Sequence, residues 1–351
     1  MQRKQHGGRL LGQGVYGCTF DPAPACSDGK IVKKVQGLSA VGKLTVEEGD
    51  AELAVGREIM HLPLAAQYFA LPTAGCSPAT PVRDPDAEDC KVLTSAGTKT
   101  KLSMLLMPAA GQQLLSKAED LQWLAANYKR TFVHLLEGML IYQGAGWTHN
   151  DIHMGNVLVD ERGVARYIDF GLAFRPADVQ RWEDSQLLRT FRPKSYWQAP
   201  EVHCWRMRLA GLRLEDGVAE LKRNIPELER IEHQMPRPRM EETMADFFRD
   251  DRTVAGRDEV GFLRTYGARF DWWRVGLCFW MLWNDLLRWP PFAEEPLYKK
   301  ERDVIRKVLG GMTQFDPRKR MGPLEALRLL DPGNLLASGS SGAASAAARK
   351  P

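Results

Sequence analysis

The sequence predicts an α+β fold in two lobes, the first built on strands and one main helix, the second mostly helical. The chain has 351 residues, 44% of them hydrophobic, which is enough for about two domains or one large two-lobed domain. β-prone segments surround a single helical pattern in the amino-terminal part, whereas apolar residues recur at helical spacing after residue 118. A connector containing proline and glycine, at 108–111, separates the two regions and is the expected hinge.

The first element is a glycine-rich hairpin. LLGQGVYGCTF places glycines at 12, 14 and 17 between β-prone residues, which lets backbone amides approach phosphate oxygens without an intervening Cβ. This spacing is weak by itself, because a dinucleotide-binding unit also begins in this way. Such a unit requires a helix next. The turn-rich DPAPACSDGK and a second strand, KIVKKV, follow instead, so the sequence argues against a dinucleotide-binding unit.

Lys33 is the expected phosphate-binding lysine of that second strand. Ile31, Lys33 and Val35 share one face at the two-residue period of a strand. A charge between two apolar neighbours is costly to bury unless it meets an anion. A solvated edge lysine is the alternative interpretation.

A capping box at 45–48, T-x-x-E, predicts the start of the main amino-terminal helix. Glu52 lies just before the apolar stripe of this helix and is the expected partner of Lys33, with Glu58 as the rival. The stripe favours Glu52, because apolar residues follow it three and seven positions later, whereas histidine and alanine hold those places after Glu58.

Three further segments follow from the same patterns. The run SMLLM predicts an apolar strand that ends near Met107, and residues 75–91 are expected to form an inserted loop. Apolar residues at helical spacing predict a core helix from about 118 to 142. The segment 202–268 carries acidic and basic side chains in nearly equal numbers, so we expect solvated helices there.

Six cysteines are scattered along the chain without a CxxC pair. This spacing fits neither a zinc site nor a dense disulfide framework, so reduced thiols in an intracellular protein, cytoplasmic or nuclear, are expected. A Cys76–Cys90 bridge in a different compartment is the alternative.

Composition also argues against several classes of protein. The net charge is +4 and no basic cluster is visible, so no nucleic-acid partner is expected. The longest unbroken apolar stretch, VGLCFWMLW, has nine residues, far fewer than the ~20 that cross a bilayer. No cleavable signal is recognised at the amino terminus, and the low-complexity tail ASGSSGAASAAARKP is expected to be disordered.

The most specific pattern begins at His149. HNDIHMGNVLVD combines an Asn150-Asp151 turn with a short buried strand at 157–159, and a polar cluster there is either a hydrogen-bonded turn or a site. RYIDFGLAF, YWQAPE, DWWRVG, RWPPF and FDPRKR follow in this order. Together the motifs resemble the eukaryotic-type protein kinase family over residues 9–332, and their joint order is far more specific than any one of them.

The resemblance implies an ATP-dependent protein kinase that transfers the γ-phosphate of Mg·ATP to a protein hydroxyl. By this resemblance Asp151 orients the attacking hydroxyl, Asn156 and Asp169 hold Mg²⁺, and Lys33, braced by Glu52, holds the inner phosphates. The further positions that the resemblance places at the nucleotide are Gly12, Gln13, Gly14, Val15, Gly17, Thr19, Ile31, Met107, Ala110 and Leu158.

The resemblance also implies an architecture. Residues 1–107 would form a small antiparallel β-sheet lobe with one main helix, and residues 108–336 a larger, mostly helical lobe with an insertion at about 202–268, followed by the disordered tail 337–351. We expect a monomer. YGCTFDPAPAC is in addition similar to the glycine loops of kinase-like proteins of large DNA viruses, which would place the protein in a host cell.

Two departures from the family pattern leave alternatives open. Asn150 stands where arginine is usual, and His153 where lysine is usual. The catalytic loop is therefore also similar to those of choline and aminoglycoside kinases, and a pseudokinase scaffold is a third possibility. YWQAPE and FDPRKR favour a protein substrate, because in protein kinases Glu201 would pair with Arg320. Base rates favour serine or threonine over tyrosine as the acceptor.

Asn150 also bears on regulation. In related kinases the arginine at this position pairs with a phosphate on the activation segment, here residues 169–201. Asparagine is uncharged and offers no bidentate fork. We therefore expect activity without phosphorylation of that segment.

Overall fold

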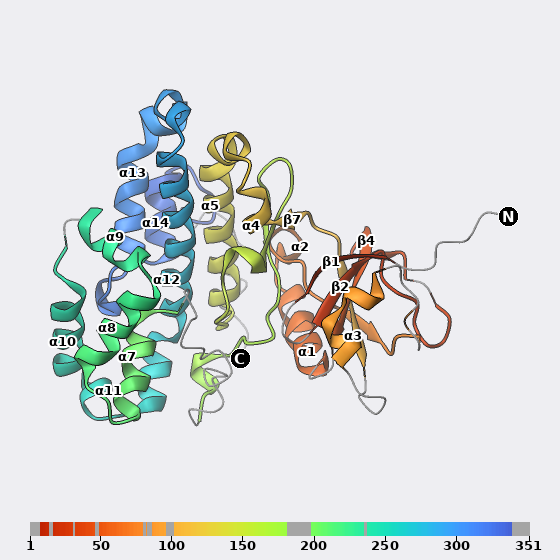
Figure 1. The fold of residues 1–351 in the computed structure, drawn as a ribbon, viewed down its shortest axis with the longest axis horizontal. Coiled ribbons are helices and arrows are strands. Elements are labelled where there is room, and N and C mark those ends of the chain that lie inside the picture. The colour runs from red at the N-terminus through yellow and green to blue at the C-terminus, as the bar shows by residue number, and fades with distance from the viewer. Residues whose placement is uncertain are drawn as a thin grey trace. The chain divides into compact units, whose positions relative to one another are not determined.

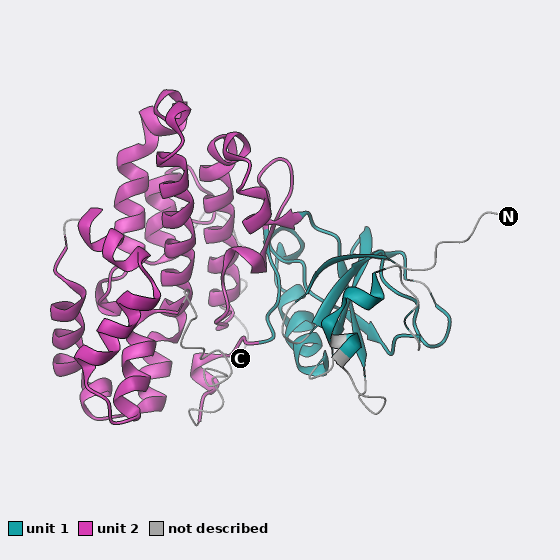
Figure 2. Ribbon diagram, in the orientation of Figure 1, with its two compact units in different colours: residues 1–111, 166–171 teal, residues 112–165, 172–351 magenta. Residues whose placement is uncertain are grey.

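The computed structural model describes residues 8–13, 17–30, 32–45, 49–79, 82, 86–95, 102–180, 198–234 and 237–338. The chain divides into two compact units: unit 1 is residues 1–111 with 166–171, and unit 2 is residues 112–165 with 172–351 (Figure 2). Unit 1 is built on an antiparallel β-sheet and unit 2 is mostly helical (Figure 1). This confirms the predicted α+β fold.

The sheet of unit 1 has the strand order β1-β2-β4-β6-β5, and β3 pairs with β4 beside this path. All its pairings are antiparallel. The strands are β1 (Arg9–Gln13), β2 (Gly17–Asp21), β3 (Lys34–Val35), β4 (Leu38–Thr45), β5 (Ala74–Cys76) and β6 (Ser103–Pro108), and the helices are α1 (Gly49–Met60), α2 (Ala65–Tyr68), η1 (Ala87–Asp89) and α3 (Lys91–Ser95).

Strand β4 corrects two sequence predictions. The segment LSAVGKLT forms the central strand of eight residues, whereas only Lys34 and Val35 form a strand among the described residues of the predicted strand KIVKKV. Thr45 does not cap helix α1 as predicted, because it is the last residue of β4 and pairs with Ser103; the described part of α1 begins at Gly49, and residues 46–48 of the predicted capping box lie outside the described residues. The turn between β3 and β4 has positive φ at residues 36 and 37, which ends the shorter strand.

The two faces of the sheet have different roles. Phe20, Leu44 and Met104 belong to one buried cluster on one face. Because successive side chains of a strand alternate, Lys43 on β4 lies on the other face, with its cross-strand neighbours Thr19 and Leu105. Helix α1 packs at β6 and supplies Glu52 to the Lys43 side.

The four cysteines of unit 1 form two disulfides, Cys18–Cys90 and Cys26–Cys76. Their partners lie 72 and 50 positions apart in the chain. This corrects the expectation of reduced thiols, and it differs from the Cys76–Cys90 alternative. The spacing of the cysteines along the chain did not predict these pairs, because the pairing of strands in the sheet decides which cysteines come within bonding distance. The other two cysteines are free and buried in unit 2.

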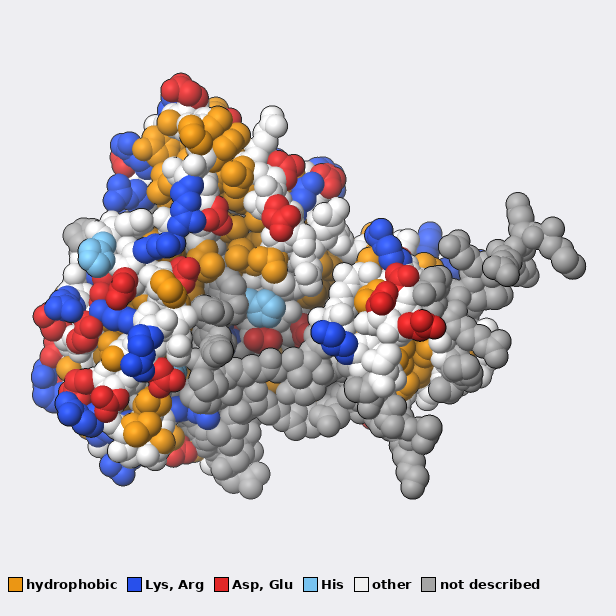
Figure 3. All heavy atoms as spheres, in the orientation of Figure 1, with side chains coloured by type: hydrophobic (Ala, Val, Ile, Leu, Met, Phe, Trp, Pro, Cys, Tyr) orange, Lys and Arg blue, Asp and Glu red, His pale blue; other side chains and the backbone are white. Residues whose placement is uncertain are grey.

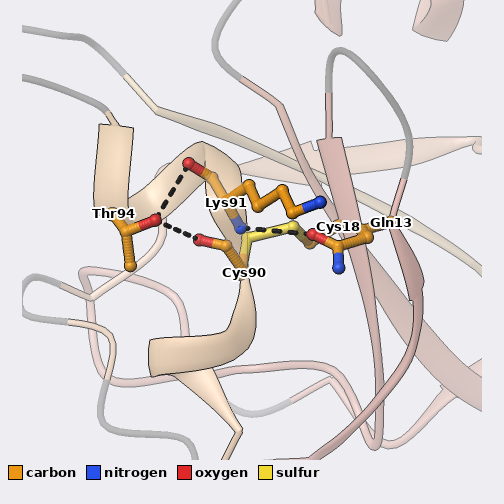
Figure 4. Close-up of a disulfide and its surroundings, with 5 residues drawn as sticks. All are labelled: Gln13, Cys18, Cys90, Lys91 and Thr94. Atoms are coloured by element: carbon orange, nitrogen blue, oxygen red, sulfur yellow. Dashed lines mark hydrogen bonds between the residues drawn. A yellow bond between two sulfur atoms is a disulfide. The ribbon is translucent and has the colours of Figure 1, made fainter.

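The first disulfide belongs to a segment that we call the strap, residues 86–91. Asp86 accepts a hydrogen bond from the backbone amide of Leu10 through Oδ2, at 2.9 Å. Gln13 accepts another from the amide of Lys91 through Oε1, at 3.3 Å, close to the disulfide (Figure 4). The strap therefore holds the first strand of the glycine-rich hairpin by hydrogen bonds and the second by a covalent bond.

Two long helices dominate unit 2, α5 (Leu121–Gly144) and α12 (Glu259–Leu287) (Figure 1). Asp120 and Asp258 cap them, each accepting the amide of the third helical residue, at 2.9 and 2.8 Å. The predicted helix at 118–142 is thus present, three residues later than expected at its start.

Aromatic side chains join these two helices. The rings of Phe132 and Phe279 stack with centroids 4.2 Å apart, and the Tyr128 hydroxyl donates to the Phe279 carbonyl at 2.7 Å. Strand β9 (Ala165–Tyr167) crosses the division between the units. The remaining elements of unit 2 are β7 (Gln112–Gln113), α4 (Leu114–Lys117), η2 (Met154–Asn156), β8 (Val157–Val159), η3 (Pro176–Asp178), α7 (Pro200–Leu209), α8 (Leu214–Asn224), α9 (Glu227–Gln234), α10 (Met240–Asp250), α11 (Arg252–Ala255), η5 (Pro290–Glu294), α13 (Pro296–Met312), η6 (Pro317–Lys319) and α14 (Pro323–Leu330).

The insertion is helical, as expected, but it is not merely solvated. Helices α8, α9 and α10 each bury one apolar stripe, through residues such as Leu221, Ile231 and Met244. On the face shown in Figure 3, acidic and basic side chains are interspersed over these helices. None of the described helices is both long and apolar enough to cross a membrane. Residues 339–351 of the predicted disordered tail lie outside the described residues.

Candidate active site

Lys43 is the centre of an ion-pair cluster in unit 1. Its Nζ lies 2.8 Å from Glu52 Oε2, 3.0 Å from Glu52 Oε1 and 3.1 Å from Asp169 Oδ1. Strand β4 provides the lysine, α1 the glutamate, and the segment after β9 the aspartate. Two consecutive elements, β4 and α1, thus meet a segment far along the chain at one ammonium group.

The electrostatics follow from burial and from these partners. Burial opposes the charge on Lys43, yet Asp169 and Glu52 together raise the pKa of its ammonium group above the ordinary range. Burial raises the pKa of Glu52, and Lys43 opposes that shift. The lysine is therefore a permanent cation whose position is set by two carboxylates.

The structure pairs Glu52 with Lys43, and not with Lys33 as the sequence predicted. Lys33 is exposed, lies just before β3, and uses its carbonyl oxygen to accept the Ala40 amide at 3.0 Å. The preference for Glu52 over Glu58 agrees with the structure, because Glu52 is buried against the sheet and Glu58 is exposed. The available signal was the position of Lys43 between the buried residues Gly42 and Leu44 of LSAVGKLT.

We expect Glu52→Gln to lower the efficiency of ATP use about tenfold or more, because the amide keeps the shape but removes the charge that orients Lys43. The measurement is kcat/KM for ATP, and Glu58→Gln on the exposed side of the same helix is the control. A larger loss in the control than in Glu52→Gln would contradict this assignment.

The backbone at Asp169 is held in an unusual conformation. Its φ is 61°, in the left-handed region that a side chain rarely adopts. A Cβ at Gly171 would lie 3.3 Å from Asp169 Oδ1, a close contact that glycine avoids. Phe170 is buried edge-to-face against Phe69, with centroids 6.0 Å apart. The buried ring anchors the segment that turns Asp169 towards Lys43.

The predicted catalytic loop lies in unit 2 and is fastened to α12. The amides of His149 and Asn150 donate to Asp271 Oδ2 and Oδ1, at 2.7 and 2.9 Å. Tyr142 from α5 also donates to Oδ2, at 3.0 Å. Asn150 has φ of 64°, and the carboxylate of Asp271 holds the two amides that lead into this strained turn. The motif DWWRVG contains Asp271, but its pattern does not indicate this role.

Two side chains order the loop beyond the turn. Asn156 Nδ2 donates to the carbonyl oxygen of Asp151 at 2.9 Å and to its Oδ2 at 3.1 Å. This places the amide oxygen of Asn156 on the side away from Asp151, where it has lone pairs for a cation. His153 Nδ1 accepts the Gly155 amide at 3.1 Å, so the residue that departs from the family pattern closes a local turn.

The structure places the other predicted nucleotide positions as follows. Gly17 is required by the sheet itself, because a Cβ there would lie 2.4 Å from the Leu44 carbonyl oxygen. Gln13 uses its side-chain oxygen to accept the Lys91 amide. Gly12 lies on β1, Thr19 on β2, Met107 on β6, Ala110 after it in unit 1 and Leu158 on β8 in unit 2, whereas Gly14, Val15 and Ile31 lie outside the described residues.

The pair between Glu201 and Arg320 is confirmed. Arg320 Nη1 and Nη2 lie 2.7 and 2.9 Å from the two carboxylate oxygens, and both side chains are fully buried. Arg320 also donates to the carbonyls of Gln314 and Arg269, at 3.1 and 2.9 Å. The bidentate geometry anchors the first turn of α7 to the helical core.

We expect Arg320→Gln to lower the free energy of unfolding by about 3–5 kcal/mol, because it leaves the carboxylate of Glu201 buried without its counter-charge. Chemical denaturation measures the change. The control is Arg288→Gln, which removes an exposed pair with Asp285 and is expected to cost less than about 1 kcal/mol. Equal losses of unfolding free energy in the two variants would show that the buried pair contributes no more to stability than the exposed pair.

Comparison with known proteins finds kinases. No protein-family model matches the chain. CBL-interacting serine/threonine-protein kinase 1 of Arabidopsis thaliana is 29% identical over 106 residues, 30% of this chain and 23% of that protein. CBL-interacting protein kinase 12 of Oryza sativa subsp. japonica is 26% identical over 196 residues, 56% of this chain and 31% of that protein. The chain therefore spans less than a third of the length of either relative.

A solved structure is similar over most of the chain. The kinase domain of a Toxoplasma gondii-specific rhoptry antigen aligns with a TM-score of 0.46 at 15% identity, covering 95% of this chain and 82% of that one.

Proposed function

We propose that the chain is a protein kinase that transfers the γ-phosphate of ATP to a protein hydroxyl, serine or threonine before tyrosine. The observation that carries the proposal is the Lys43–Glu52–Asp169 cluster in unit 1, together with the Asp151–Asn156 loop fastened to Asp271 in unit 2. The cluster neutralises charge and the loop positions the attacking hydroxyl. Phosphoryl transfer requires mainly these two contributions from a protein.

Lys43 binds the inner phosphates, because it is a buried cation with its position set by two carboxylates. The carboxylate of Asp151 accepts the hydrogen bond of the attacking hydroxyl and orients it. The Asn156 side chain holds the Asp151 carboxylate in place at 3.1 Å. The proposal thus keeps the predicted role of Asp151 and transfers that of Lys33 to Lys43.

Asn156 and Asp169 would hold Mg²⁺, since amide and carboxylate oxygens are hard ligands that suit this ion. The orientation of Asn156 fits this role, because its Nδ2 is used on Asp151 and its oxygen is not. When bound, the ion would supply positive charge that neutralises the phosphate oxygens.

A protein substrate is favoured over a small alcohol by the Glu201–Arg320 pair. In protein kinases this pair fastens the peptide-binding segment to the lower lobe, and here it is fully buried and bidentate. A small-molecule phosphotransferase of the choline or aminoglycoside type remains the second candidate, because His153 departs from the usual lysine.

The test is transfer of labelled phosphate from Mg·ATP, run in parallel on peptide libraries and on small alcohols. We expect transfer to peptides. Transfer to an alcohol alone would select the second candidate, and ATP binding without transfer to either would indicate a pseudokinase scaffold.

We further propose that the protein folds in an oxidising compartment, in place of the cytoplasm or nucleus expected from cysteine spacing. The two disulfides of unit 1 support this proposal, because disulfides persist in such compartments and are rare where thiols are kept reduced. The test is mass spectrometry of peptides prepared without reductant from cells that make the protein. Free thiols at these four cysteines would refute it.

A further inference from the structure

Arg274 is a buried cation that the functions proposed above do not use. It lies on α12 with 2% of its surface exposed, three residues after Asp271 and therefore on the same side of the helix. Its Nε and Nη1 are buried and find no hydrogen-bond partner among the described residues. An arginine buried in this way is costly unless opposite charge compensates it.

Four groups from three elements interact electrostatically with this guanidinium. They are Asp151 of the catalytic loop, Asp271 and Cys278 of α12, and Tyr142 of α5. Burial lowers the pKa of Arg274, and the two aspartates oppose that shift most strongly.

The two aspartates are not equivalent partners of Arg274. Both carboxylate oxygens of Asp271 already accept hydrogen bonds, from two loop amides and from Tyr142. Burial raises the pKa of the Cys278 thiol, which is therefore neutral at physiological pH. The negative charge of Asp151 thus has Arg274 as a counter-charge inside the helical core.

The position of Arg274 also provides the positive charge that Asn150 lacks. Asn150 is uncharged, and its Nδ2 donates to the Leu172 carbonyl at 3.3 Å. No positive charge therefore comes from the residue before Asp151. Arg274 supplies one from inside α12, where it does not depend on a phosphate.

We propose that Arg274 is a positioning residue, whose buried charge holds the carboxylate of Asp151 in place and makes the loop competent without phosphorylation of the activation segment. This inference rests on the proposed kinase function. Its physical core, an attraction between Arg274 and Asp151, can be measured without any activity.

The first experiment is a double-mutant cycle on thermal unfolding at fixed neutral pH, with Arg274→Met, Asp151→Asn and the double variant. We expect Arg274→Met to lower the unfolding midpoint at least about 2 °C less in the Asp151→Asn background than in the wild type, since the charge to be compensated is gone. Arg269→Met, on the same helix, removes a guanidinium that donates to the Pro317 carbonyl, and its effect should be additive with Asp151→Asn. If Arg274→Met does not fold, Arg274→Gln takes its place in the cycle.

The second experiment measures peptide phosphorylation. Arg274→Met should lower kcat about tenfold or more with KM for ATP unchanged, and Arg274→Lys, which keeps the charge, should recover most of the loss. Phosphatase treatment of the wild type should change activity less than twofold. Additive effects in the cycle, or equal activity of the Met and Lys variants, would overturn the proposal. If the wild type transfers no phosphate, the proposed function fails and the cycle still decides the role of Arg274.

Discussion

Removing both disulfides of unit 1 is expected to lower its unfolding midpoint by more than about 10 °C. Each bridge restricts a long loop of the unfolded chain, with partners 72 and 50 residues apart. Loss of such a native bridge typically costs about 2–5 kcal/mol, and about 1 kcal/mol shifts the midpoint of a domain of this size by several degrees. The change is the substitution of the four bridged cysteines by alanine.

The same substitution should raise KM for ATP, because Gln13 of the hairpin is held by the amide next to Cys90 (Figure 4). Scanning calorimetry and ATP titration measure the two effects. The matched control is Cys204→Ala, which removes a buried cysteine of unit 2 that forms no bridge. A cysteine-free unit 1 that unfolds within about 2 °C of the wild type would show that the bridges do not stabilise the native sheet.

The largest expected effects on activity come from Lys43→Met and Asp151→Asn. Each should lower phosphate transfer about a thousandfold while the protein remains folded, since Lys43 neutralises phosphate charge and Asp151 orients the hydroxyl. Methionine keeps much of the volume of lysine, and asparagine that of aspartate. Circular dichroism checks the fold, and single-turnover transfer from Mg·ATP measures the loss.

Lys33→Met is the matched control for Lys43→Met. Lys33 is exposed beside β3, so its replacement should leave transfer within about twofold of the wild type. The comparison separates the lysine that the strand pattern indicated from the lysine that the structure brings to Glu52. A stronger loss in Lys33→Met, or near-normal transfer by a folded Asp151→Asn protein, would refute the assignment of the site.

Some of the site follows from the sequence because its interactions are local. The turn at 150–151, the strand at 157–159 and the hydrogen bonds from Asn156 to Asp151 lie within ten residues of one another. Their spacing along the chain therefore nearly determines their geometry. The stripe on α1 likewise identifies Glu52, because a helix presents residues three and four apart on one face.

The rest depends on how distant segments meet. Alternation along KIVKKV shows which residues share a face, but not whether a neighbouring strand pairs with them, so the pattern could not choose Lys43 over Lys33. Cysteine spacing likewise does not reveal which strands lie side by side, and the disulfides were missed for that reason.

The sequence by itself determined the α+β class, the predominance of strands in the first region and of helices in the second, and the local hydrogen bonding of the loop at 150–156, because these rest on contacts between near neighbours in the chain. Only the tertiary structure decided the partner of Glu52, the disulfide pairs and the burial of Arg274 behind the loop. Those features depend on how the strands and helices pack, or on which side chains surround a charge, and one-dimensional periodicity carries no information about either.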